Sequence, residues 1–163
     1  NLWITCALEF RGRHRELWVP NRWTPLFFHD EAVAFAAGHR PCGECRYVDY
    51  QAYKAAWSEA HGGPRPSAGE MNRRLHAERI FRGTHRRRFH EVPWTELPDG
   101  AFVLEDDAPA LVLGSDLVAW SPAGYGERRR RPRRGTGTAI TPPATLGVLR
   151  AGYPVQIDSS ARG

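Results

Sequence analysis

The hydrophobic period changes along this chain of 163 residues, and that change is what most constrains the fold. Over residues 47–61, apolar residues recur at helical spacing, and capping patterns at Asp30 and Ser67 predict two further helices. Beyond Gly100 they form short runs typical of strands, over residues 102–104, 110–113 and 117–120. Gly114-Ser115, between two of these runs, predicts a tight hairpin turn. The pattern predicts an α+β fold with a β-rich C-terminal half.

Helix signals cluster in the first half of the chain. Asp30 suits an N-cap and Gly38 suits the left-handed position after a helix, so a short helix is expected between them. Ser67 and Glu70 have the spacing of a capping box, in which each side chain bonds the other residue's backbone N–H. Helices are therefore expected over residues 31–37, from just after 45 to 61, and from 67 to about 81.

Four other segments have weaker patterns. We expect short strands or hairpins within residues 1–28, an exposed loop over 128–134, a short helix within 143–152 and a last strand near 153–157.

The composition limits the classes of protein to which this chain could belong. Hydrophobic residues make up 41% of the chain and charged residues 25%. The longest apolar stretch, residues 32–37, is far shorter than the roughly 20 residues of a membrane-spanning helix. No secretory signal pattern is visible in residues 1–10, so a cytoplasmic location without a membrane partner is expected.

Charge is unevenly distributed. The formal net charge is +5, with a basic stretch over residues 70–90, an acidic one over 91–127 and a second basic one over 128–134. Lys54 is the only lysine among 23 Lys and Arg residues. The guanidinium group of arginine can donate two hydrogen bonds to one phosphate at the same time, which favours nucleic acid as a partner. A GC-rich genome and a need for solubility are the alternative explanations.

The strongest local motif is a C-x-x-C knuckle. Residues 38–46 are Gly-His-Arg-Pro-Cys-Gly-Glu-Cys-Arg, so Cys42 and Cys45 lie in a turn that leads into a helix. Such a turn aims both sulfurs at one point, and the helix N-terminus favours thiolate. With an odd total of three cysteines, a metal site or a reactive thiol is expected rather than a disulfide framework.

Two segments resemble the N-terminal metal-binding domain of Ada, the methyl-phosphotriester repair family. Residues 26–46, LFFHDEAVAFAAGHRPCGECR, are similar to its second half, and residues 6–14, CALEFRGRH, look like its C-x-x-x-C-R-x-R-H segment. The resemblance covers residues 3–57. It implies a zinc ion held by cysteines that include Cys6, Cys42 and Cys45, and it implies that Cys6 accepts a methyl group from DNA.

The match is incomplete at one ligand position. Phe10 stands where the family has its second cysteine. Tetrahedral zinc needs a fourth donor, for which His14 is favoured by its place in the matching segment. Without a fourth protein donor, the open position would suit a catalytic zinc that activates water. The alternative donors are Glu9, His29, His39, His85 and His90.

Arginines are the candidate nucleic-acid ligands. Those near the cysteines would lower the thiol pKa values and attract a phosphate. Those in residues 84–90 are interleaved with an aromatic ring, as on nucleic-acid surfaces, although a solvated charged face has the same pattern. Those in residues 128–134 could follow a phosphate backbone or lie in a loop tip. The candidates are Arg11, Arg13, Arg40, Arg46, Arg86, Arg87, Arg88, Arg128, Arg129 and Arg130.

A second group of titratable residues offers an alternative chemistry. His76, His85 and His90, with Glu78 and Glu91, could bind a metal or act as acid and base in phosphodiester cleavage. Histidines at such places are also commonly hydrogen-bonded residues without a catalytic role.

Three functions follow as hypotheses. The first is a zinc-dependent, DNA-binding protein of repair type that accepts an alkyl group on Cys6. The second is a zinc-dependent hydrolase or nuclease, and the third is a binding module with structural zinc. The expected organisation is an Ada-like metal-binding module over residues 1–60, a connecting helix and basic segment over 61–98, and a β-rich part over 99–163.

Overall fold

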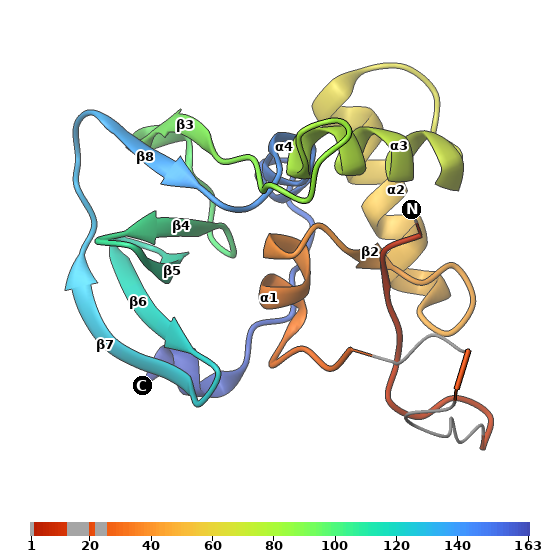
Figure 1. Cartoon of the computed structure of the whole chain (residues 1–163), viewed down its shortest axis with the longest axis horizontal. Helices are drawn as coiled ribbons and strands as arrows, with labels where there is room; N and C mark the ends of the chain where they lie inside the picture. The colour runs from red at the N-terminus through yellow and green to blue at the C-terminus, as the bar shows by residue number, and fades with distance from the viewer. Residues whose placement is uncertain (1, 13–19, 22–25) are drawn as a thin grey trace.

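Helices occupy the first half of the chain and a sheet most of the second, which confirms the predicted α+β fold (Figure 1). The computed structural model describes residues 2–12, 20–21 and 26–163. Among these residues, no helix is both long and apolar enough to span a bilayer. The helices are α1 (Glu31–Ala36), α2 (Tyr47–His61), α3 (Ala68–Arg79), α4 (Pro143–Arg150) and the 3₁₀ turns η1 (Trp94–Glu96) and η2 (Ser159–Arg162). The strands are β1 (Ile4–Thr5), β2 (Arg40–Pro41), β3 (His90–Pro93), β4 (Phe102–Glu105), β5 (Ala108–Leu113), β6 (Asp116–Ser121), β7 (Gly124–Arg130) and β8 (Thr136–Ala139).

The predicted helix signals are present. Asp30 accepts a hydrogen bond from the Val33 N–H at the start of α1, and Ser67 and Glu70 form both bonds of the capping box of α3. Gly38 follows α1 with a φ of 79°. A Cβ there would lie 2.6 Å from the Arg79 side chain, so a larger residue would disturb both α1 and α3.

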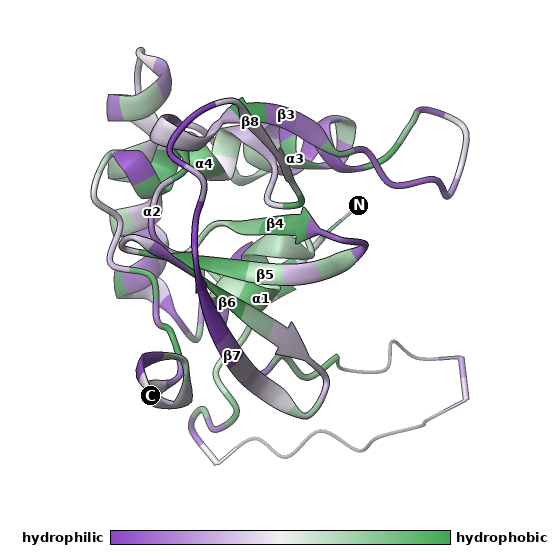
Figure 2. Cartoon of the chain, turned by 90° about the vertical axis from the view of Figure 1, so that its left-hand side faces the viewer, coloured by the Kyte–Doolittle hydropathy of each residue, from purple (hydrophilic) through white to green (hydrophobic). Residues whose placement is uncertain are grey.

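The sheet has six strands in the order β3-β8-β4-β5-β6-β7, and every pair is antiparallel. The hairpin between β5 and β6 turns at Gly114-Ser115, as predicted. Successive residues of a strand face opposite sides of the sheet. Phe102 and Leu111 therefore belong to one cluster of buried residues, and Val103 and Val112 belong to another. Figure 2 shows the apolar character of β5 against the hydrophilic edge strand β7.

Two helices contribute to the cores of both halves. Phe35 of α1 packs in the helical core with Tyr53, while Ala32 of the same helix packs against the sheet. Leu146 of α4 lies in the second cluster of the sheet, and Val148 lies in the helical core. The expected module boundaries near residues 60 and 98 stay predictions.

Two predicted elements are wrong. Residues 153–157 form no strand, because the Val155 N–H bonds the Tyr153 carbonyl and the Gln156 N–H bonds the buried Glu31 carboxylate. Residues 128–130 belong to β7 rather than to a loop. Their charges are tolerated in a strand because acidic side chains lie beside them.

Candidate metal centre

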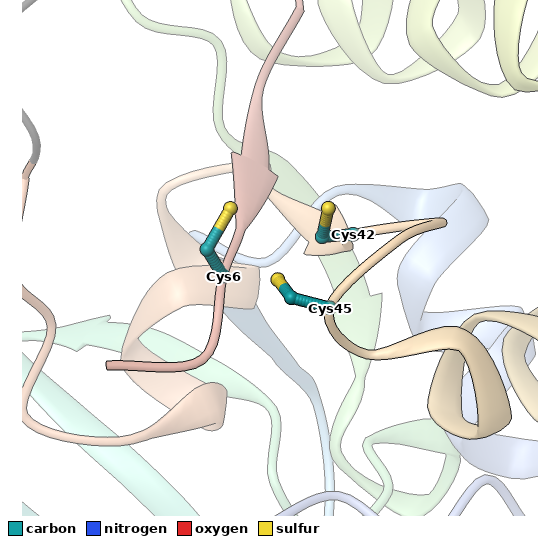
Figure 3. A group of neighbouring side chains, drawn as sticks. All are labelled: Cys6, Cys42 and Cys45. Atoms are coloured by element: carbon teal, nitrogen blue, oxygen red, sulfur yellow. The ribbon is translucent and has the colours of Figure 1, made fainter. Parts of the chain in front are cut away.

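A short parallel strand pair brings the three cysteines together. Thr5 of β1 pairs with Pro41 of β2, and the Cys42 N–H donates to the Thr5 carbonyl at 3.0 Å. Cys6 follows β1 directly and Cys42 follows β2 directly, so the strand register places them side by side. Cys45 lies in the turn that leads into α2 (Figure 3).

The three sulfurs lie within 4.8 Å of one another. Sulfurs around a tetrahedral zinc are about 3.8 Å apart, given a Zn–S length of about 2.3 Å. Cys6 is exposed, Cys45 is half-buried and Cys42 is buried. The cluster is thus close enough to hold a metal ion, and it is accessible on the Cys6 side.

Backbone N–H groups point at two of the sulfurs. The Glu44 N–H donates to Cys42 Sγ at 3.4 Å, and the Ala7 N–H donates to Cys45 Sγ at 3.3 Å. Such bonds stabilise thiolate relative to thiol. The turn of residues 42–45 and the segment after Cys6 therefore provide donors to the sulfur cluster.

The thiols strongly influence one another's ionisation. Burial, followed by the nearby Cys42 and Cys45, raises the pKa of Cys6 to about 12. Burial also raises the pKa of Cys42, but hydrogen bonds from the backbone of Glu44 and Cys45 and from the Cys45 and Cys6 side chains together lower it below its usual value. Three adjacent thiolates repel one another unless a cation lies between them, so the donor set fits a divalent, thiophilic metal.

The cluster is anchored to the core through Arg46, just before α2. Its Nη2 lies 2.7 Å from Glu31 of α1 and 2.7 Å from Asp49. Glu31 also accepts bonds from the Tyr153 hydroxyl and the Gln156 N–H. A buried carboxylate with these partners fixes the start of α2 against α1 and thus fixes the knuckle.

No fourth ligand joins the sulfurs in the part of the chain that the structure describes. The favoured donor, His14, lies outside the described residues. His39 is only 5% exposed and packs against the rings of Trp3 and Phe28. Burial, followed by the charge of Arg79, lowers its pKa to about 4. The alternatives Glu9, His29, His39, His85 and His90 do not belong to the cluster.

No protein-family model, curated protein or solved structure matches this chain. The resemblance of residues 3–57 to the Ada domain therefore stays a prediction, based on the motifs themselves.

Two candidate phosphate ligands near the cysteines are turned into the protein. Arg40 is 4% exposed, with Nε on Asn72 at 2.9 Å and Nη1 on the Pro41 carbonyl at 3.0 Å. Arg46 is held by the two carboxylates of Glu31 and Asp49. Both guanidinium groups serve the fold, because each is turned inward onto protein acceptors. Arg11 is exposed over the Phe10 ring, and Arg13 lies outside the described residues.

The arginines of β7 form ion pairs with acids of β6, of β4 and of the turn after β4. Arg128 and Arg130 lie near Asp116 of β6, and Arg129 pairs with Glu105 and Asp106. These pairs reduce the positive potential that β7 would offer to a phosphate backbone.

The basic segment between α3 and β3 keeps its positive charge exposed. The Phe81 N–H bonds the Arg86 carbonyl, which folds the segment into a narrow loop. The guanidinium carbons of Arg86 and Arg88 lie 5.7 and 5.1 Å from the Phe81 ring centroid. Phe81 and Phe89 are each 45% exposed. The interleaving of rings and guanidinium groups predicted for this segment is thus displayed at the surface.

The histidine–carboxylate group does not form a metal site among the described residues. His90 Nε2 is 2.7 Å from the Glu78 carbonyl, and Glu91 accepts bonds from Thr136 and Thr138 on β8. The side chains of His90 and Glu91 thus serve the junction of α3, β3 and β8. The structure does not support a joint acid–base role for them.

A pocket that the sequence does not reveal lies between α1 and the sheet. Its volume is about 710 Å³, and it is open to solvent. Its walls come from five separate parts of the chain, so no local pattern could have predicted it. Aromatic residues on its walls are Phe27, Phe28, Phe89, Phe102 and Trp120, and the polar ones are His29 and Arg87.

Proposed function

We propose that this chain is a zinc-binding protein of DNA-repair type that binds nucleic acid and accepts an alkyl group on Cys6. The proposal combines the sulfur cluster with the exposed basic segment of residues 81–89. Three cysteine sulfurs within 4.8 Å of one another support a soft-ligand metal, and zinc is the common choice for such a set. Bound zinc would keep the three sulfurs deprotonated at neutral pH.

One observation carries the choice of Cys6 as acceptor. Cys42 and Cys45 each receive a backbone N–H bond, whereas no backbone N–H of a described residue donates to Cys6 Sγ. A hydrogen bond stabilises a thiolate and so reduces its nucleophilicity. Cys6 is also the exposed member of the three. With zinc bound and all three sulfurs deprotonated, Cys6 would therefore be both the most reactive and the most accessible sulfur.

The transfer is a single in-line displacement at carbon. A lone pair of Cys6 Sγ forms an S–C bond to the methyl group of a DNA phosphotriester while the C–O bond breaks. The bonding pair stays on the departing oxygen, which becomes the anionic oxygen of an ordinary phosphodiester. The product on the protein is a thioether, so each chain reacts once.

The exposed segment of residues 81–89 supports nucleic acid as the partner. Arg86 and Arg88 lie at the surface beside the Phe81 ring, and the exposed ring of Phe89 on the same segment offers a face on which a base could stack. Electrostatic binding of this kind weakens as the salt concentration rises.

Incubation of the zinc-loaded chain with methylated DNA is expected to add one CH₂ unit to Cys6. Trypsin releases Cys6 in a peptide that ends at Arg11, whereas Cys42 and Cys45 share a peptide that ends at Arg46, so mass spectrometry separates the acceptor from the other thiols. Cys6→Ser is the matched control and should gain nothing. An unmodified Cys6 in zinc-loaded chain that binds the methylated DNA would contradict the transfer and favour the structural-zinc alternative.

A further inference from the structure

The pocket between α1 and the sheet lies next to the exposed basic segment. Its lining includes Val33 and Ala36 of α1, Ala37 just after that helix, and residues of β4, β5 and β6. Arg87 and Phe89 of the basic segment complete the lining. A volume of about 710 Å³ is within the range of small-molecule sites.

The lining chemistry suits a flat, apolar-faced ligand with polar edges. Phe27, Phe89 and Trp120 line the pocket and come from three separate segments of the chain. Trp120 Nε1 is buried without a hydrogen-bond partner among the described residues. A buried donor of this kind is costly unless a ligand or a water completes it.

Arg87 brings a positive charge to this pocket. Arg87 has no ion pair with any residue that the structure describes, in contrast to Arg128, Arg129 and Arg130. Burial, followed by the charge of Arg87, lowers the pKa of Arg79 to about 10. Arg87 also makes a smaller contribution to the lowered pKa of His39, after burial and the charge of Arg79. An apolar pocket beside unpaired guanidinium charge is complementary to an aromatic ligand that carries an anionic group.

We propose that this pocket holds the base of one unpaired nucleotide, with the adjacent phosphate on Arg87. This inference depends on the nucleic-acid binding proposed above and assigns it a base-binding site. A base inside a duplex is stacked and cannot enter a pocket, so the ligand is single-stranded or has an extruded base. Stacking on the rings makes the site tolerant of base identity, because every base has a π-face.

The test compares two short single-stranded DNAs of equal length, one of mixed sequence and one fully abasic. Both carry the same phosphates, so only the first can fill the pocket. Fluorescence anisotropy with the zinc-loaded chain is expected to give about tenfold or more weaker binding to the abasic strand. Equal affinities would overturn the pocket assignment and leave nucleic-acid binding intact. Failure to bind either strand would overturn both this inference and the nucleic-acid part of the proposed function.

Matched variants assign the base preference to the pocket. Phe89 and Phe81 are equally exposed on the same segment, but only Phe89 lines the pocket. Phe89→Ala should reduce the preference for the base-containing strand by about fivefold or more, and Phe81→Ala should preserve it. Arg87→Ala should weaken binding of the base-containing strand more than Arg82→Ala, which removes the same charge outside the pocket. A preference lost in Phe81→Ala and kept in Phe89→Ala would contradict the proposal. Melting curves of each variant confirm that the fold is retained.

Discussion

Removal of the metal, by chelation or by Cys42→Ser, is expected to lower the free energy of unfolding by about 5 kcal/mol. Without the proposed cation, the charge of three sulfurs within 4.8 Å of one another would not be balanced, and a thiolate at the buried Cys42 would not be compensated. The effect should be smaller than in an isolated zinc finger, because this chain also has three clusters of buried residues. For a domain of this size the loss corresponds to a decrease in Tm of roughly 10–20 °C.

Thermal melts followed by circular dichroism measure this difference directly. The chelator should destabilise the unmodified chain and have little further effect on Cys42→Ser, because the variant no longer holds the ion. Substitution of an exposed residue far from the cluster, such as Asp107→Asn, is the control and should leave the sensitivity to chelator unchanged. A Tm that is identical with and without chelator would contradict a stabilising metal.

The second large effect is expected at Phe35, whose replacement by alanine should lower the free energy of unfolding by about 3–5 kcal/mol. Phe35 is fully buried, and its ring centroid lies 5.5 Å from that of Tyr53 and 5.6 Å from that of Tyr153. Truncation leaves a cavity between α1, α2 and the segment after α4. Those same elements support the knuckle through Glu31 and Arg46.

Urea unfolding measures this loss as a lower midpoint with an unchanged m-value. Phe81→Ala, at a ring that is 45% exposed, is the matched control and should cost less than about 1 kcal/mol. Equal losses for the two variants would contradict the packing described for the helical core.

The sequence predicts those features that depend on local patterns. Asp30 and the pair Ser67 and Glu70 predict helix starts, because capping depends on residues within one turn. Cys42 and Cys45 predict a metal knuckle for the same reason. The addition of Cys6 to this set came from a resemblance, since nothing in the spacing alone indicates a parallel pairing of Ile4–Thr5 with Arg40–Pro41.

Features that depend on contacts between distant residues could not be predicted. Arg40 and Arg46 flank the knuckle in the sequence as surface cations would, yet each finds a buried partner, Asn72 for Arg40 and Glu31 for Arg46. Arg130 is tolerated in a strand because Asp116 lies across from it and pairs with it. The pocket could not be predicted for the same reason, because its lining residues come together only when α1 packs on the sheet.

The most direct test of the metal centre is the metal content of the purified chain under conditions that preserve non-covalent complexes. We expect one zinc ion per chain in native mass spectrometry, its loss in Cys42→Ser, and slow reaction of Cys42 and Cys45 with iodoacetamide until a chelator is added. A folded chain that carries no metal and whose three thiols are alkylated at the rate of free cysteine would contradict the account.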